Sequence, residues 1–214
     1  MPELYLISPP TFELADFAKQ LEAAITAVDK GFTTAFQLRL KNASDEQITE
    51  ATNSLLPICQ AYDVAFIMND RIDLCIDLGC DGVHVGQEDL AGTSIKQVRN
   101  ELGEEKVLGI TCHASKHLAM EAAEAGADYV AFGAFYPTTS KPKEKLEKWG
   151  TPTPDILEWW TTYTEIPAVA IGGITPDNCS PLLAADFLAV ITAVWEHKDG
   201  PAAAIQAFYQ SIHG

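Results

Sequence analysis

TTAFQLRLKNASDEQITEATNSLLPICQAYDVAFIMNDR, residues 33–71, contains a complete strand–helix–strand unit. The apolar runs at Thr33–Leu38 and Val64–Met68 are continuous rather than alternating, which is typical of strands that are covered on both faces. Between them, Asp45–Tyr62 carries an apolar face at helical spacing and follows Ser44, a residue type that caps helices well. The stretch therefore predicts two neighbouring parallel strands joined by a helix, each strand ending in polar side chains.

The same alternation continues along the whole chain. Apolar runs predict eight strands, at Leu4–Ser8, Thr33–Leu38, Val64–Met68, Gly82–Val85, Lys106–Ile110, Tyr129–Gly133, Ala168–Gly172 and Phe187–Ile191. Helical spacing is found at Asp16–Asp29, Asp45–Tyr62, Thr93–Leu102, Ser115–Ala125 and Asp155–Tyr163, and Thr175 with Pro176 and Asp177 is typical of a further helix start. Eight units in 214 residues predict a single (β/α)8 TIM barrel over residues 1–214, with a doubly wound open sheet as the weaker alternative.

Composition narrows the functional classes. The formal net charge of −16 argues against nucleic acid or an anionic membrane as a partner. No apolar stretch is long enough to span a bilayer, and the N-terminal residues do not resemble a signal peptide, so we expect a cytoplasmic protein. Five cysteines without a CxxC pair favour reduced, buried thiols over disulfides or a zinc site.

In a parallel barrel the loops after the strands open onto one face, where the chemistry of this fold takes place. Asp70 and Asp89 follow the third and fourth expected strands, and carboxylates are the ligands that Mg²⁺ prefers. Two such aspartates could equally cap the following helices, and Asp70 could pair with Arg71. A magnesium site and these structural roles both stay open on the residues alone.

Positive charge gathers after the second expected strand. Arg39 and Lys41 extend to the same side, together with Gln37, while Leu40 points away. An arginine fork and a lysine point charge at this spacing suit a phosphate or diphosphate better than a surface ion pair.

Further phosphate-binding candidates follow the last three strands. PTTSK places Thr138, Thr139, Ser140 and Lys141 after the sixth strand, within an irregular stretch, Tyr136–Thr153, that could form a lid or a solvated loop. Gly172 and Gly173 end the seventh strand and Ile191-Thr192 the eighth, where this fold usually binds phosphate. Of the histidines near the mouth, we interpret His84 as a hydrogen-bonded structural residue and leave an acid–base role open for His113.

The ordered motifs QLRLK, MNDR, DGVHVGQED, GITCHAS, DYVAFGAFYPTTSK and AIGGITPDN resemble those of the thiamine-phosphate synthase family over nearly the whole chain. The resemblance implies a (β/α)8 barrel enzyme, a transferase that couples 4-amino-2-methyl-5-pyrimidinylmethyl diphosphate with a thiazole phosphate to give thiamine phosphate and pyrophosphate. It implies Mg²⁺ as the cofactor, small phosphorylated pyrimidine and thiazole molecules as partners, and leaves a homo-oligomer open.

The resemblance also implies a role for individual residues. It makes Asp70 and Asp89 the magnesium ligands and Arg39, Lys41 and Lys141 the catalytic cations that neutralise the leaving diphosphate. The diphosphate side comprises Gln37, Arg39, Lys41, Asn69, Thr111 and Lys141, and the thiazole-phosphate side comprises Thr138, Thr139, Ser140, Gly172, Gly173, Ile191 and Thr192.

Two rival functions are considered. A thiazole tautomerase shares the barrel and would use His113 as an acid–base catalyst, but an isomerase needs no diphosphate site. A non-catalytic barrel that binds a thiamine precursor would need neither the metal-binding acids nor the phosphate-binding cations, and both are present.

Overall fold

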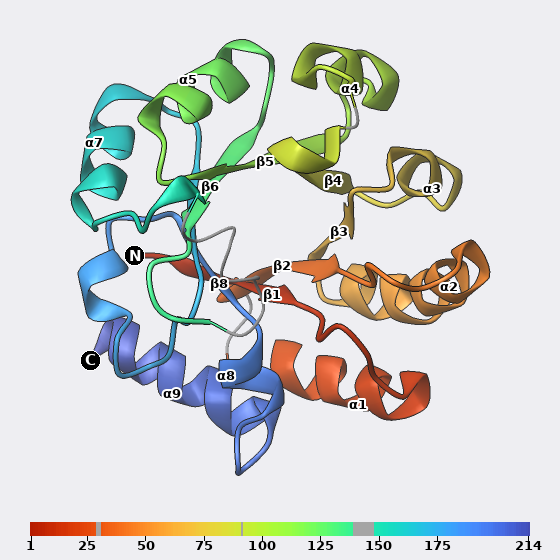
Figure 1. The fold of residues 1–214 in the computed structure, drawn as a ribbon. Coiled ribbons are helices and arrows are strands. Elements are labelled where there is room, and N and C mark those ends of the chain that lie inside the picture. Colours follow the sequence, from red (N-terminus) through yellow and green to blue (C-terminus); the bar gives the residue numbers. More distant parts are fainter. Residues whose placement is uncertain (29–30, 91, 139–147) are drawn as a thin grey trace.

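The computed structural model describes residues 1–28, 31–90, 92–138 and 148–214, with the backbone alone for Glu88 and Asp89. Eight parallel strands pair in chain order and close into a barrel, because β1 also pairs with β8 (Figure 1). The strands are β1 (Glu3–Ile7), β2 (Thr33–Leu38), β3 (Ala65–Asn69), β4 (Gly82–Gly86), β5 (Val107–His113), β6 (Tyr129–Gly133), β7 (Ala168–Ile171) and β8 (Phe187–Val190). The (β/α)8 barrel predicted from the sequence is confirmed, and the open sheet is excluded.

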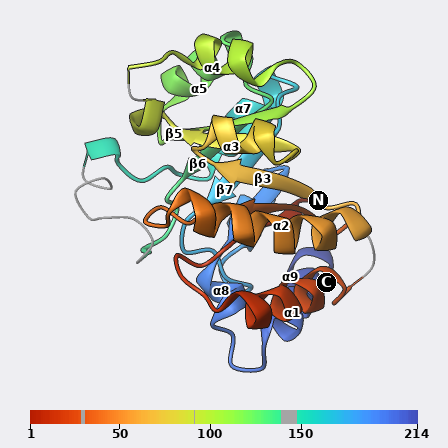
Figure 2. The same cartoon turned by 90° about the vertical axis from the view of Figure 1, so that its right-hand side faces the viewer.

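Helices surround the barrel, and both termini lie at the end opposite the loops that follow the strands (Figure 2). The helical elements are α1 (Leu14–Ile25), α2 (Asp45–Ala61), α3 (Ile72–Asp77), η1 (Gln87–Leu90), α4 (Ile95–Leu102), α5 (Lys116–Glu124), α7 (Asp155–Tyr163), η2 (Ser180–Leu182), α8 (Thr192–Trp195) and α9 (Pro201–His213). The last helix, α9, packs against α1 and so completes the ring beside the strands that close the barrel. Within the described ranges, no helix is both long and apolar enough to cross a membrane.

Local sequence signals explain why the elements begin and end where they do. Ser44 and Ser94 form capping boxes with Gln47 and Gln97, which satisfy backbone N–H groups at the starts of α2 and α4. Gly103 follows α4 with φ +82°, a conformation that favours glycine. These signals fix the lengths of the helices and therefore the points at which the chain enters the next strand.

The apolar side chains form two layers. The larger layer lies between the sheet and the helices and includes Phe36 and Trp160, both fully buried. The smaller layer fills the barrel interior and includes Tyr5, Ile67 and Tyr129. The tyrosines separate the upper part of the barrel from a second, mostly apolar cavity at the amino ends of the strands, which Ala65 also lines.

Aspartates placed just before alternate strands tie the lower end of the sheet together. The Oδ2 atoms of Asp81, Asp128 and Asp186 accept hydrogen bonds of 2.7 Å from the backbone N–H groups of Phe66, Leu108 and Ala168. Each aspartate therefore satisfies a donor at the start of the preceding strand. These carboxylates have a structural role at the end of the barrel away from the expected site.

Three expectations about local structure are corrected. No helix begins at Thr175: Asn178 accepts a hydrogen bond from the Thr175 backbone and folds this segment into turns, followed by the three-residue η2. Strand β5 is longer than expected and includes His113, which the sequence placed just beyond it. The helices α3, α8 and α9 were not among the expected ones. The first two are too short to show a helical period, whereas α9 is long enough and was overlooked.

Candidate active site

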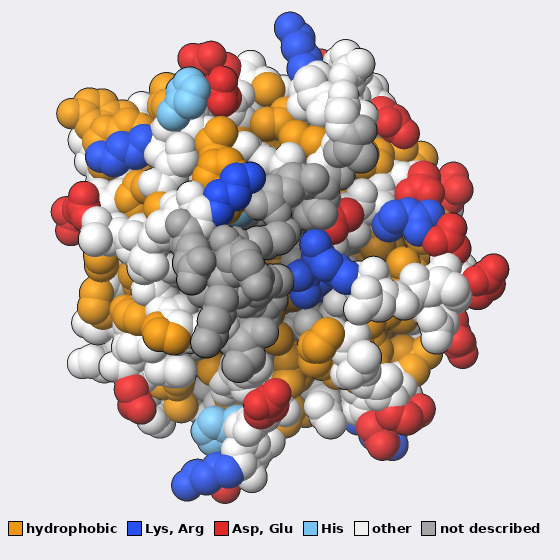
Figure 3. Space-filling view, in the orientation of Figure 1, with side chains coloured by type: hydrophobic (Ala, Val, Ile, Leu, Met, Phe, Trp, Pro, Cys, Tyr) orange, Lys and Arg blue, Asp and Glu red, His pale blue; other side chains and the backbone are white. Residues whose placement is uncertain are grey.

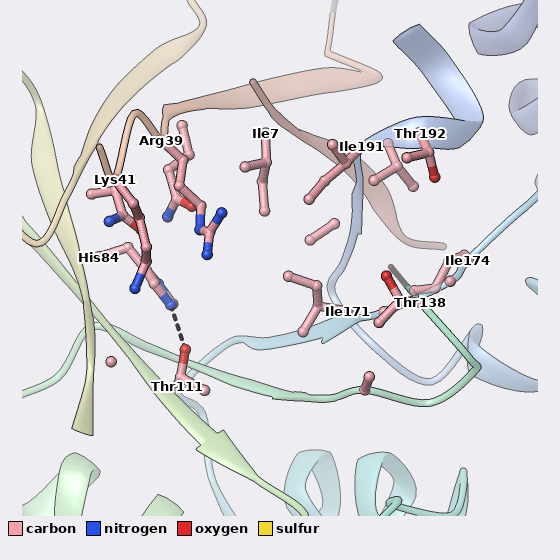
Figure 4. Close-up of a pocket in the computed structure, with 18 of the residues that line it drawn as sticks. Ile7, Arg39, Lys41, His84, Thr111, Thr138, Ile171, Ile174, Ile191 and Thr192 are labelled. Atoms are coloured by element: carbon pink, nitrogen blue, oxygen red, sulfur yellow. Dashed lines mark hydrogen bonds between the residues drawn. The ribbon is translucent and has the colours of Figure 1, made fainter. Parts of the chain in front are cut away.

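A pocket opens at the carboxyl ends of the strands, and most of the residues predicted for the site line it. They are Gln37, Arg39, Lys41, Asn69, Asp70, Thr111, Thr138, Gly172, Gly173, Ile191 and Thr192. Figure 4 shows Arg39 and Lys41 on one side of the pocket and Thr138, Ile174 and Thr192 on the other. Thr139, Ser140 and Lys141 lie outside the described residues.

The cationic side of the pocket is built on the end of β2. Gln37 belongs to the strand and is buried, whereas Arg39 and Lys41 follow it and face the pocket (Figure 4). The hydroxyl of Ser8, at the end of β1, accepts a hydrogen bond of 2.9 Å from the Arg39 backbone N–H. Lys41 Nζ lies 3.5 Å from Asp70 Oδ2. The two cations are therefore held by neighbouring strand ends, as a site for an anionic group requires.

Asp70 occupies an unusual backbone conformation at the end of β3. Its φ is +62°, a region that a short polar residue tolerates better than most but that still carries strain. The amide of Asn69 donates to Asp70 Oδ2 at 2.5 Å, and the Gly86 backbone N–H donates to Oδ1 at 3.4 Å. The carboxylate is thereby fixed at the pocket wall.

Arg71 does not pair with Asp70, so this alternative for the carboxylate is wrong. Its guanidinium makes a two-pronged contact with Asp45 at the start of α2 and donates to Asp73 Oδ2 at 2.6 Å. These hydrogen bonds hold the pKa of both aspartate carboxyls below the usual value. Arg71 therefore connects the starts of α2 and α3, whereas the Asp70 carboxylate lines the pocket.

The donor set suits Mg²⁺, although within the described part of the chain no three acidic, histidine or cysteine side chains cluster as a complete metal site. Mg²⁺ usually takes only one or two carboxylates and completes its shell with water and substrate phosphate. Asp70 provides one carboxylate oxygen pair at the pocket wall. Asp89 lies in η1, directly after β4, and its side chain lies outside the described atoms.

The opposite wall depends on a glycine turn after β7. A Cβ on Gly172 would lie 2.3 Å from Ala134 Cβ, and one on Gly173 would lie 2.5 Å from the Pro137 carbonyl oxygen. Both residues also have positive φ, +106° and +64°. Glycine is therefore required here by close packing against the loop after β6, a reason that the sequence did not reveal.

Two side chains bind the loops after β6 and β7 to each other. The amide of Asn178 donates to the Gly173 carbonyl oxygen at 3.0 Å, and the Tyr136 hydroxyl donates to the Asn178 carbonyl oxygen at 2.7 Å. Sequence reasoning included Asn178 in a motif but gave it no function. Its position three residues after Thr175 is the signal that could have identified it as a turn residue.

The two histidines near the mouth have different surroundings. His84, which the sequence assigned to a structural role, bonds through its ring nitrogens to Tyr129 and Thr111 and also lines the pocket. His113 is 6 % exposed, has φ +54° and stacks on Trp149, with ring centroids 4.6 Å apart and the planes 1° from parallel. The indole thus covers one face of the imidazole at the edge of the pocket.

Several lining residues were missed because they are apolar or because, like Gln87, they lie within a motif that gave them no role. They are Ile7, Gly86, Gln87, Ala134, Ile171, Ile174, Ala189 and Val190. Their alternation with outward-facing residues along the strands is the signal that could have indicated them. They give the pocket an apolar surface between its two polar sides, which suits a flat heterocycle between two phosphate groups.

The charges on this face are segregated. Figure 3 shows that most of the acidic side chains visible on it lie toward the periphery, whereas Lys and Arg side chains also lie near the centre. The overall negative charge of the chain therefore does not extend uniformly into the mouth, where Arg39 and Lys41 are placed.

Comparisons with known proteins agree with this geometry. A family model described as thiamine monophosphate synthase matches residues 4–194. Curated proteins named thiamine-phosphate synthase include one from Rhodospirillum centenum, 52% identical with 99% of this chain and 98% of that protein covered, and one from Erythrobacter litoralis, 51% identical with 98% and 95% covered. A solved structure, thiamine phosphate pyrophosphorylase from Pyrococcus furiosus, superposes with a TM-score of 0.81 at 29% identity and covers 98% of this chain and 95% of that one.

Proposed function

Because the chain belongs to the thiamine monophosphate synthase family and is therefore a transferase, we propose that it couples 4-amino-2-methyl-5-pyrimidinylmethyl diphosphate with a thiazole phosphate and releases pyrophosphate. The observation that carries the proposal is the arrangement of the pocket, with Arg39 and Lys41 on one side and the Gly172–Gly173 turn on the other. Two sites for anionic groups, separated by an apolar surface, match the two phosphorylated ends of such a substrate pair.

We assign the diphosphate to the side of β2 and β3. Arg39 and Lys41 would bind its oxygens, and Asn69 would contribute a further amide donor. As the C–O bond breaks, negative charge grows on the leaving diphosphate, and fixed positive charges at this position lower the barrier. Lys141 is proposed as a third cation on the strength of the resemblance alone.

Asp70 and Asp89 would hold Mg²⁺ beside the diphosphate. When bound, the ion supplies positive charge to the oxygens of the leaving group. In the described structure Asp70 contacts Lys41, so the carboxylate also keeps that ammonium at the pocket wall. The position of Asp70 at the pocket wall, beside Lys41, supports this assignment for Asp70.

The second substrate would occupy the side formed by the loops after β6, β7 and β8. Thr138, Gly173 and Thr192 line this side and offer hydroxyl and backbone donors to a phosphate. Thr139, Ser140, Gly172 and Ile191 complete the proposed set. Binding there would leave the thiazole nitrogen facing the pyrimidine methylene. Once the C–O bond has broken and pyrophosphate has taken the bonding electrons, the nitrogen lone pair attacks the pyrimidine-stabilised cation. The apolar residues between the two sides would exclude competing water.

The proposal is tested by incubating purified protein with both substrates and Mg²⁺ and by measuring pyrophosphate and thiamine phosphate together. We expect release of the two products in equal amounts, and no release when either the thiazole phosphate or Mg²⁺ is omitted. Turnover of a thiazole isomer without any pyrimidine substrate would identify a tautomerase instead. A folded protein that binds the substrates without turning them over would identify a binding protein.

A further inference from the structure

A continuous chain of hydrogen bonds crosses the interior of the barrel beneath the pocket. Gln37 Nε2 donates to the Tyr5 hydroxyl at 3.1 Å, and the two phenol oxygens of Tyr5 and Tyr129 lie 2.8 Å apart. The Tyr129 hydroxyl lies 2.9 Å from His84 Nδ1, and His84 Nε2 lies 2.8 Å from Thr111 Oγ1 (Figure 4). The first and last members of this chain, Gln37 and Thr111, both line the pocket.

The direction in which these hydrogen bonds donate follows from the first of them. Because the amide donates to Tyr5, the hydrogen of Tyr5 is used toward Tyr129, and the hydrogen of Tyr129 is used toward His84 Nδ1. In this direction Nε2 would carry the ring proton and donate to Thr111, which lies 2.8 Å away. In this order each phenol accepts one bond and donates one, so no buried hydroxyl hydrogen is left without an acceptor, which would be unfavourable.

Both tyrosines keep the protons that this order requires. Tyr5 and Tyr129 are 3 % and 7 % exposed, and burial raises the pKa of each phenol well above its usual value. Neutral phenols can act as donor and acceptor at the same time, whereas a phenolate could only accept.

Packing holds the rings in these positions. The Tyr5 and Tyr129 rings meet edge to face with centroids 5.9 Å apart, and the His84 ring lies against the Tyr129 ring at 5.5 Å. A Cβ on Gly109 would lie 1.9 Å from Tyr129 Cζ. The glycine of β5 therefore provides the space through which the Tyr129 ring reaches the barrel axis.

We propose that Tyr5, Tyr129 and His84 are positioning residues that determine which hydrogen-bonding groups the pocket presents to substrate. At one end, the chain uses an N–H of Gln37 and leaves its amide carbonyl oxygen to accept from an amino group. At the other end, Thr111 accepts from His84, and its own hydroxyl hydrogen is available for an anionic oxygen. The floor of the pocket is thereby polarised, with an acceptor on the β2 side and a donor on the β5 side.

The polarity fits the substrate of the proposed function, on which the inference rests. An aminopyrimidine carries an amino group that donates, and its diphosphate carries oxygens that accept. A pocket with the opposite polarity would place an acceptor against an anion, which is unfavourable. The two tyrosines would therefore affect catalysis through Gln37 and Thr111 without touching substrate, and His84, which also lines the pocket, would act through its bond to Thr111.

The direction is tested without any substrate by ¹⁵N NMR of histidine-labelled protein at mildly alkaline pH. The His84 signals are identified by their absence in His84→Gln. We expect a neutral imidazole protonated at Nε2, with Nδ1 as the acceptor. Protonation at Nδ1 would mean that Thr111 donates to the ring and that the chain runs in reverse, and it would overturn the proposal whatever the enzyme's activity.

The effect on catalysis is tested with Tyr129→Phe, which removes one hydroxyl and keeps the ring. We expect kcat to fall about tenfold, as the loss of one well-directed hydrogen bond predicts, and the KM for the thiazole phosphate to stay within about twofold. Tyr62→Phe is the matched control, because it removes a phenol that is hydrogen-bonded to Glu22 on the outer helices. The control is expected to retain wild-type kinetics.

A double-mutant cycle separates positioning from general loosening of the barrel. If Tyr129 acts through Thr111, then Tyr129→Phe adds no further loss of kcat to Thr111→Val. Additive losses, or equal increases in both KM values, would overturn the proposal. A wild-type protein that turns over neither substrate would instead reject the proposed function, and the NMR result would still decide the direction of the chain.

Discussion

Lys41, after β2, and Asp70, at the end of β3, form an ion pair of 3.5 Å between two neighbouring strand ends at the mouth of the barrel. Both side chains are partly buried, at 35% and 24% exposure, and both line the pocket. The pair joins a proposed diphosphate ligand to a proposed magnesium ligand. When substrate binds, Asp70 would contact Mg²⁺ and Lys41 would contact the diphosphate in place of each other. Neither side chain would need to move far from its position in the described structure.

Lys41→Ala is expected to lower kcat/KM about a hundredfold, because it removes a charge that would stabilise the leaving diphosphate. The melting temperature should change little, since a partly exposed ion pair contributes at most about 1 kcal/mol. Lys19→Ala is the matched control, because Lys19 pairs with Asp16 at 3.2 Å on the outer helix α1. Near-normal kinetics in Lys41→Ala would remove this residue from the site.

Asp70→Asn is expected to raise the Mg²⁺ concentration needed for half-maximal activity by at least about tenfold. The substitution keeps the size of the side chain and removes the charge that Mg²⁺ prefers. Activity should be measured across a magnesium titration at saturating substrates. Asp16→Asn, on the surface of α1, serves as the control. An unchanged magnesium requirement in Asp70→Asn would contradict the assignment of Asp70 as a metal ligand.

Gly173→Ala is expected to destabilise the fold by at least about 1 kcal/mol and to reduce activity, because the added Cβ meets the Pro137 carbonyl oxygen in a backbone conformation that alanine adopts poorly. Gly150→Ala is a close control. Its φ is +70°, against +64° for Gly173, but a Cβ there would have no atom of another described residue within 4 Å, its chain neighbours aside. The two variants therefore share the backbone strain and differ in the contact, and chemical denaturation with steady-state kinetics will separate the two effects. Equal losses in both would show that packing against the β6 loop is unimportant.

The Arg71 cluster is expected to contribute to stability at neutral pH and to lose that contribution in acid. The guanidinium lowers the pKa of the Asp45 and Asp73 carboxyls relative to their unfolded value of 3.8. A depressed folded pKa gives a stabilisation that is complete above the unfolded pKa and is lost as the pH falls below it, through the folded pKa.

The measurement is denaturant unfolding of the wild type and Arg71→Ala from neutral pH to below the ordinary aspartate pKa. The difference between the two proteins should be constant near neutrality and should shrink in acid. A difference that does not depend on pH would mean that Arg71 acts through packing alone. Lys19→Ala controls for the loss of an exposed ion pair.

The fold could be predicted from the sequence because each strand is a short, continuous apolar run with a clear end. The expected bounds of β2 and β6 match the observed ones, and those of β1 and β3 differ by one residue at each end. For β4, β7 and β8 only the last residue differs, by one position, whereas β5 ends three residues later than expected. The main errors arose where tertiary contacts decide the structure. At Thr175 the sequence carries a helix-start signal, but the Asn178 side chain folds the backbone into a turn.

For the site, the polar residues at the strand ends could be identified, because the barrel brings all of these ends together. The contacts among them could not be identified. Nothing local indicates that Arg71 reaches Asp45, or that Lys41 rather than Arg71 faces Asp70. The roles of Tyr5 and Tyr129 were also missed. A tyrosine in an apolar strand looks the same in the sequence whether or not its hydroxyl belongs to a chain of hydrogen bonds.

The layer formed by Tyr5 and Tyr129 divides the interior of the barrel into two compartments with different tolerance to mutation. Above it, the loss of a single hydroxyl group would alter the hydrogen-bonding groups that the pocket presents to substrate. Below it, the apolar cavity lined by Ala35 and Ala65 meets the tyrosines from the other side, and none of the described residues that line it is proposed to bind substrate directly. Larger side chains in that lower compartment could add packing without reaching the pocket. Evolution and protein engineering can therefore adjust the robustness of this barrel from one end while its specificity is adjusted from the other.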